Sequence, residues 1–160
     1  LEAIGLSANP SPFKRSTIAC TGIEFCKLAI VETKATATET VKTLERKLVD
    51  VQIGRPISLH INGCPNSCAR IQTADIGLKG QLLPDGNGGT SPGFQVHLGG
   101  GLATKDRDEA GLGRTVRGLK VTADELPDYV ERLVRRFEAD KAGDETFASW
   151  AHRAEEEALQ

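Results

Sequence analysis

The spacing of apolar residues changes along this chain and marks out the elements that we expect. Helical spacing predicts one helix over 24–33 and another over about 38–51. The second helix rests on apolar residues three or four positions apart, namely Ala37, Val41, Leu44 and Leu48. Alternating apolar and polar residues, or short apolar runs between turn formers, predict strands. These expected strands are 57–61, 75–79, 93–98 and 114–121.

The last forty residues have a purely helical pattern. Thr122 and Glu125 are spaced as a capping box, and the apolar stripe that follows predicts a packed helix. The stripe is Leu126, Val130, Leu133, Val134 and Phe137. After Gly143 a second helix is expected, with one face formed by Phe147, Trp150, Ala151 and Ala154. The predicted fold class is therefore α+β, with a small mixed β-sheet, helices packed on it and two C-terminal helices.

Composition limits the kinds of protein that this chain can be. A net charge of −2, with 39% hydrophobic and 26% charged residues, is typical of a soluble globular segment. The chain has neither an apolar run that would cross a membrane nor the basic balance of a nucleic-acid-binding protein, so we expect no membrane and no nucleic acid as partners. It contains no methionine, not even at position 1, so we expect the natural start to lie upstream. We expect 1–16 to be a connector from an upstream module, 17–121 to be the cofactor-binding domain and 122–160 a helical extension packed on it.

Four cysteines stand out from this ordinary background. Cys20 and Cys26 are separated by five residues, and Cys64 and Cys68 by three. Thiolates are soft ligands that suit iron and zinc, and four of them complete either a cubane iron–sulfur cluster or a closed zinc site. The residue types therefore predict a metal centre held by Cys20, Cys26, Cys64 and Cys68.

Disulfides and structural zinc are the two alternatives to a cluster. Disulfide frameworks occur mainly in short secreted chains, whereas 160 residues can bury a core without them. Zinc knuckles usually bring in their cysteines with two to four intervening residues, fewer than the five between Cys20 and Cys26. We therefore favour an iron–sulfur cluster.

Proline after Cys64 predicts the local geometry of the second pair. Pro65 suits the first position of a helix, which would place Cys64 at the N-cap and Cys68 on the same helical face. The free N–H groups and the dipole of such a helix start would favour an anionic cluster. In the first pair, Cys20 is expected in a loop and Cys26 near the start of the helix over 24–33.

The residues around the second pair identify a family. The stretch from Asn62 to Arg70 reads Asn-Gly-Cys-Pro-Asn-Ser-Cys-Ala-Arg, and Ala74-Asp75-Ile76-Gly77-Leu78 follows it. Together with the run from Thr17 to Cys26, it resembles the 4Fe-4S and sirohaem signature of the ferredoxin-dependent nitrite and sulfite reductases. The chain looks like the C-terminal, cluster-binding half of such an enzyme.

The resemblance implies roles for individual residues. The four cysteines would bind the 4Fe-4S cluster, and Cys68 would also be the axial ligand of the sirohaem iron. Arg70 and Asn66 are the nearest candidates for contacts to the sirohaem, since a cation can pair with its carboxylates. Further candidate cations are Lys79, Lys105, Arg107, Arg114 and Arg117. The Arg and Lys residues that capture the anion come mainly from the first half in this family, so beyond the bridging Cys68 we expect no catalytic residue here and no activity of this portion alone.

The resemblance also implies an activity and partners. The expected enzyme is an assimilatory sulfite reductase, which reduces sulfite to sulfide with six electrons from ferredoxin. The alternative in the same family is a nitrite reductase, which makes ammonia; a different class would be a non-catalytic iron–sulfur electron-transfer module. Arg70, two residues after Cys68, favours sulfite, whereas Ser67 and the 74–77 run favour nitrite. Expected partners are the N-terminal half of the same polypeptide, ferredoxin and a small anion. The expected location is the bacterial cytoplasm, or the plastid if the source is a plant or alga.

Overall fold

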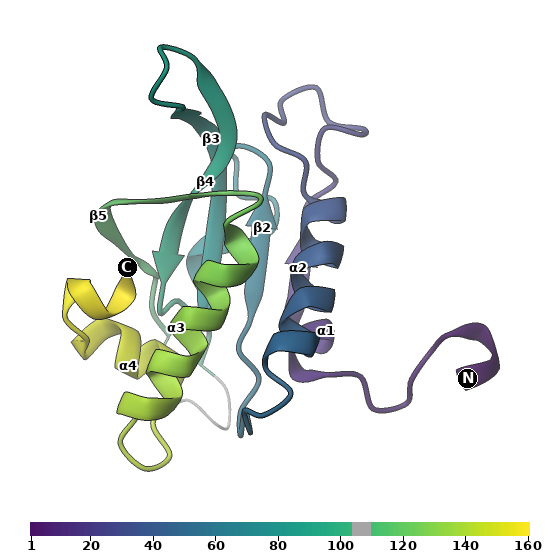
Figure 1. The fold of residues 1–160 in the computed structure, drawn as a ribbon, viewed down its shortest axis with the longest axis vertical. Helices are drawn as coiled ribbons and strands as arrows, with labels where there is room; N and C mark the ends of the chain where they lie inside the picture. Colours follow the sequence, from purple (N-terminus) through teal and green to yellow (C-terminus); the bar gives the residue numbers. More distant parts are fainter. Residues whose placement is uncertain (104–109) are drawn as a thin grey trace.

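The computed structural model describes residues 1–103 and 110–160 and contains one mixed β-sheet with helices packed on it (Figure 1). The strands, in their order across the sheet, are β1 (Thr17–Ala19), β2 (Leu59–Asn62), β3 (Ile76–Pro84), β4 (Thr90–Leu98) and β5 (Arg114–Thr122). The α-helices are α1 (Pro12–Ser16), α2 (Lys34–Lys47), α3 (Leu126–Asp140) and α4 (Phe147–Arg153). Short 3₁₀ helices occur at Glu2–Ile4, Ile71–Thr73 and Glu156–Leu159. Within the described ranges, no helix is both long and apolar enough to cross a bilayer.

Strand direction divides the sheet into two parts. β1, β2 and β3 run parallel, with Ile18 opposite His60 and His60 opposite Gly77. β3, β4 and β5 form an antiparallel meander, interrupted by an irregularity in register between Gln95 and His97. The C-terminal ends of β1 and β2 therefore lie at the same edge of the sheet.

One face of the sheet forms the core. Leu59 and Ile61 on β2 are fully buried, as are their register partners Ile76 and Leu78 on β3. They pack into one hydrophobic cluster with side chains of α2, α3 and α4, including the fully buried Leu44, Val130 and Trp150. Figure 1 shows α2 and α3 side by side over this face. The alternate residues of β2 and β3, among them His60 and Lys79, lie on the other face.

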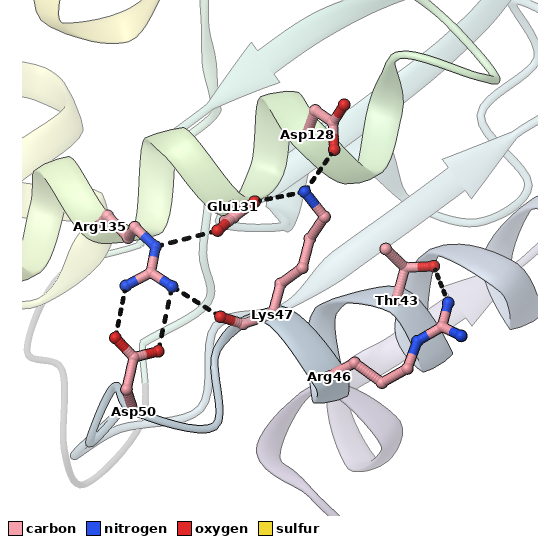
Figure 2. Close-up of polar contacts among 7 residues, drawn as sticks. All are labelled: Thr43, Arg46, Lys47, Asp50, Asp128, Glu131 and Arg135. Carbon is pink, nitrogen blue, oxygen red and sulfur yellow. Dashed lines mark hydrogen bonds and ion pairs between the residues drawn. The ribbon is translucent and has the colours of Figure 1, made fainter.

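A network of ion pairs joins α2 to α3 (Figure 2). Lys47 at the end of α2 contacts Asp128 and Glu131 of α3, at 2.8 Å each. Arg135 of α3 pairs with Glu131 at 3.0 Å and forks onto both carboxylate oxygens of Asp50, at 2.9 and 3.0 Å. These hydrogen bonds lower the pKa of Asp50 and of Glu131 and raise that of Lys47. The network joins the C-terminal end of α2 to α3, and the opposite end of α2 begins beside the first cysteine loop.

Most of the predicted elements are confirmed with shifted ends. The four expected strands are present as β2 to β5, and both C-terminal helices form. The capping box is confirmed, since Thr122 N donates to Glu125 Oε2 at 3.0 Å and Glu125 N to Thr122 Oγ1 at 3.3 Å. The helix expected over 38–51 begins four residues earlier, at Lys34. The carboxylate of Glu32 accepts from Ala35 N at 2.8 Å and from Thr36 N at 3.2 Å, and so caps this earlier start.

The helix predicted over 24–33 is wrong. This segment consists of turns, such as the one that Cys26 N closes onto Gly22 O at 2.9 Å. Its apolar residues Phe25, Leu28 and Ile30 are 72%, 65% and 38% exposed although Val31 is buried, so no continuous buried face stabilises a helix here. The sequence pattern also missed β1, a strand of three residues that has a partner on one side only.

Candidate metal centre

Both cysteine pairs begin where parallel strands end. Cys20 directly follows β1, and its N–H donates to Ile61 O of β2 at 3.0 Å, which extends the ladder. Cys64 comes two residues after the end of β2. In sheets with parallel strands, ligands commonly bind beyond the carboxyl ends of neighbouring strands. The topology thus brings two loops that are distant in sequence to one edge.

The loop with Cys64 and Cys68 contains no helix, so the helix start predicted at Pro65 is wrong. The chain passes through consecutive turns, with Ser67 and Arg70 at φ of 60° and 54°. A right-handed helix needs φ near −63°, and the left-handed conformation of Ser67 prevents continuation. Arg70 N closes a turn onto Ser67 O at 2.8 Å. The expected helix dipole is therefore not a feature of this site.

Asn62 holds the two ends of this loop together. Its side chain is 0% exposed. Its Nδ2 donates to Cys64 O at 2.7 Å, and its Oδ1 accepts from Ala69 N at 2.9 Å. One amide therefore bridges the residues at which the loop begins and ends.

Two glycines of β3 let the chain around the second cysteine loop approach this strand closely. A Cβ at Gly77 would be 1.9 Å from Ile71 O. A Cβ at Gly80 would be 2.6 Å from Gly63 O and 2.7 Å from Asn62 O. A side chain at either position would push the loop off the sheet, so both glycines are needed for close backbone approach.

The first cysteine loop is fastened to the start of α2. Thr33, which precedes that helix, is 0% exposed and donates from Oγ1 to Cys20 O at 2.8 Å. The same hydroxyl lies 3.9 Å from Cys20 Sγ. Since Glu32 caps the helix, Thr33 is available to hold the loop.

Gly63 connects the two loops. Its N–H donates to Cys20 Sγ at 3.2 Å, and its carbonyl accepts from Ile30 N at 2.7 Å and Val31 N at 3.1 Å. The segment after Cys26 and the segment before Cys64 are therefore joined backbone to backbone. The structure brings both predicted cysteine pairs into one neighbourhood.

The donor set fits an iron–sulfur cluster. All four cysteines have free thiols, so the structure does not support the disulfide alternative. In the ranges 1–103 and 110–160, no three Cys, His, Asp or Glu side chains are grouped closely enough to hold a metal ion, so the preference for a cluster over zinc rests on the spacing of the cysteines. An N–H group already points at one sulfur, an interaction that stabilises thiolate-bound clusters.

The remaining candidate residues lie at varying distances from the cysteine loops. Asn66 and Arg70 belong to the loop itself and are exposed. Lys79 is half-buried on β3, opposite Asn62 in register. Arg114 donates to His152 O at 3.2 Å and Ala154 O at 3.3 Å, at the end of α4, while Arg117 is exposed on β5. The other two cations, Lys105 and Arg107, lie outside the described residues.

Arg70 also lines a cavity of about 700 Å³, together with Ser58, His60 and Phe147. Burial lowers the pKa of His60, whose Nδ1 lies 3.3 Å from Arg70 O. Asp75 Oδ2 accepts from Ser58 N at 2.8 Å and from Ser58 Oγ at 2.7 Å, so this residue of the signature joins the start of β2 to β3.

Sequence patterns did not reveal the supporting roles of Asn62, Thr33 and Gly63. The sequence offers one signal for Asn62 and Thr33, since each is a polar residue next to a cysteine loop. Their complete burial, which requires hydrogen-bond partners, is visible only in the structure. Gly63 was recognised only as part of the signature.

Comparison with known proteins decides the family. Residues 11–160 match the family described as the nitrite and sulphite reductase 4Fe-4S domain. The chain belongs to this family. The solved structure of the NirA protein of Mycobacterium tuberculosis superimposes with a TM-score of 0.93 at 53% identity, covering 99% of this chain and 29% of that one. A dissimilatory sulfite reductase I, at 14% identity and a TM-score of 0.66, shares the fold over 90% of this chain and 50% of its own.

Named relatives of this 4Fe-4S domain fall into two groups. Sulfite reductase [ferredoxin] 1 of Mycolicibacterium paratuberculosis is 53% identical over 162 residues, which cover 100% of this chain. The chloroplastic ferredoxin–nitrite reductase of Zea mays is 37% identical over 139 residues, 87% of this chain and 23% of its own length. The chain spans 28% of the length of the first relative. It therefore corresponds to a portion of a larger enzyme.

Proposed function

We propose that this chain is the cluster-binding portion of an assimilatory, ferredoxin-dependent sulfite reductase that reduces sulfite to sulfide. The observation that carries the proposal is the meeting of the two cysteine loops at one edge of the sheet, joined through Gly63. The identity of 53% to a sulfite reductase [ferredoxin], against 37% to a nitrite reductase, supports sulfite as the substrate.

In this proposal Cys20, Cys26, Cys64 and Cys68 hold a 4Fe-4S cluster, and Cys68 is also the axial ligand of a sirohaem. When bound, these groups supply one-electron transfer and the reducing centre for the anion. The chain's own residues would hold the thiolates in place, and they shield Cys64 most from water. Cys64 is buried, Cys20 and Cys26 are half-buried and Cys68 is exposed. The exposed thiolate is the one that a second cofactor outside the chain can reach, which supports its double role.

In this proposal Asn66 and Arg70, which are exposed residues of the same loop as Cys68, contact the sirohaem. An arginine can pair with the cofactor's carboxylates through parallel N–H groups. Both residues belong to the loop that Asn62 closes, so their positions depend on the same clamp.

We also propose that the rest of the polypeptide, its N-terminal half, covers the first cysteine loop. Ile23, Phe25, Leu28 and Ile30 are 38% to 72% exposed, within eight residues of one another. Apolar side chains gathered in this way mark an interaction surface, and the chain spans only 28% of its relative. The thiolate ligands need a reducing compartment, which supports a cytoplasmic location.

The full-length protein, purified anaerobically, tests this function. About five iron atoms should be present for every four acid-labile sulfides, because the cluster supplies four of each and the sirohaem one further iron, and the protein should show the absorption of a sirohaem. Reduced ferredoxin should support faster turnover of sulfite than of nitrite. Faster turnover of nitrite would move the enzyme to the other branch of the family. A colourless protein with zinc bound would overturn the proposal.

The double role of Cys68 has its own test. Cys68→Ser should change the sirohaem spectrum and spin state, because the axial ligand sets the electronics of the iron. Cys20→Ser is the matched control, since it should affect the sirohaem only through loss of the cluster. Samples must contain the same amount of sirohaem. Identical sirohaem spectra in the two variants would show that Cys68 is not the axial ligand.

A further inference from the structure

We infer that Asn62 is a positioning residue for the cluster: its buried amide sets the shape of the Cys64–Cys68 loop and contributes to the reduction potential. This inference rests on the proposed function, because it assumes that the four cysteines hold a cluster. It adds a residue that is not a ligand.

The burial of Asn62 shows that its amide must be paired. Polar side chains with 0% exposure are rare unless all their groups have partners, because an unpaired buried amide is costly. Asn62 meets this requirement with Cys64 O and Ala69 N, 2.7 and 2.9 Å away. Both partners are main-chain groups of one loop, so the amide specifies the loop conformation rather than a contact between strands.

The pairing needs one donor and one acceptor on the same side chain. Cys64 O can only accept a hydrogen bond, and Ala69 N can only donate one. Asparagine has both groups at the correct reach, whereas an ionised aspartate has no donor and leucine has neither. The chemistry of the two loop ends therefore selects an amide.

Asn62 also affects the surroundings of two cysteine sulfurs. Its Nδ2 lies 4.0 Å from Cys64 Sγ, and the next residue, Gly63, donates its N–H to Cys20 Sγ at 3.2 Å. By fixing the backbone on both sides of Gly63, the amide keeps this second N–H directed at the first loop. Donors near cluster sulfurs stabilise the reduced, more negative state and raise the reduction potential. Loss of the amide should therefore lower the potential.

Four variants of the full-length protein test the inference. Asn62→Leu removes both hydrogen bonds, and Asn62→Asp keeps only the acceptor for Ala69 N. Asn87→Asp makes the same chemical change at an exposed turn between β3 and β4. Leu44→Ala lowers stability from within α2, where Leu44 is 0% exposed and outside both cysteine loops in sequence. The two measurements are the rate of iron release to a chelator and the midpoint potential of the cluster.

Asn62→Leu should release iron at least about tenfold faster than the wild type, because two buried main-chain groups lose their partner. The midpoint potential should fall from wild type to Asn62→Leu and further to Asn62→Asp, whose carboxylate adds negative charge near Cys64. Asn87→Asp should match the wild type in both measurements. Leu44→Ala should leave the potential unchanged, which separates positioning from general destabilisation.

The inference is overturned if both Asn62 variants keep the wild-type potential, or if Leu44→Ala lowers it equally. If Asn62→Leu does not fold, the rate of iron release from Asn62→Asp decides, because the charge of its carboxylate lowers the potential whether or not the loop changes shape. A wild-type protein without iron and sulfide overturns the proposed function and this inference together. If the wild type contains a cluster and the Asn62 variants behave like Asn87→Asp, the inference is overturned but the proposed function stands.

Discussion

Gly77→Ala is expected to damage the metal centre although Gly77 lies on a strand, outside both cysteine loops. The added Cβ would be 1.9 Å from Ile71 O and 2.7 Å from the carbonyl carbon of Ile71. Carbon and oxygen approach one another to about 3.3 Å, so Ile71 has to move by about 1.4 Å. Both groups that would collide are held by the main chain, Gly77 in the sheet and Ile71 in the 3₁₀ turn. Rotation of a side chain therefore cannot relieve the clash.

This displacement should reach the cysteines through the loop. Ile71 is three residues after Cys68 and directly follows Arg70, whose backbone already lies in the left-handed region. Overpacking of this kind costs about 1–3 kcal/mol, and a misplacement of about 1 Å near a reacting centre can reduce the rate about 10²-fold. We therefore expect the full-length variant to lose iron and sulfide or to turn over sulfite about a hundredfold more slowly.

Gly54→Ala is the matched control, since a Cβ there has no atom within 4 Å and should have no effect. Iron analysis and steady-state turnover with reduced ferredoxin are the assays. Full cluster content in Gly77→Ala, with a rate within about twofold of wild type, would refute the reasoning that close backbone contact with β3 sets the loop position.

Three further predictions concern the folding of the domain. Trp150→Ala should destabilise it by about 3–5 kcal/mol in denaturant unfolding, because Trp150 is 0% exposed and packs on Phe137 and Phe147; a loss below about 1 kcal/mol would contradict its place in the core. Burial lowers the pKa of His60 and His97 below 6.5, so stability should be complete above that pH and decline as the pH falls toward the folded pKa values. Replacing both histidines with Gln should flatten this part of the curve, and an unchanged slope would argue against their neutral burial. Arg135→Met should weaken the link between α2 and α3 in low salt but not in about 1 M salt, where exposed ion pairs are screened; a loss that persists in high salt would mean that packing is responsible.

Periodicity predicted the elements whose burial is regular. The α3 stripe from Leu126 to Phe137 and the alternation in β2 both face one core. Burial against a core stabilises such a periodic pattern, so the pattern predicts the element. The capping box could also be predicted, because its two hydrogen bonds join residues only three apart. Prediction failed over 24–33, where Phe25, Leu28 and Ile30 are exposed although Val31 is buried, so the apolar residues do not form one core-facing stripe.

The sequence alone determined the family, because four soft ligands and the residues around them form its signature. Only the tertiary structure decided how these ligands come together. The contact from Gly63 to Cys20 joins residues 43 apart in the sequence, and the Asn62 bridge reaches Ala69 across a loop in which Ser67 is left-handed. A local pattern has no access to such contacts, because the pairing of β1 with β2 and the close approach at Gly77 exist only once the sheet has formed.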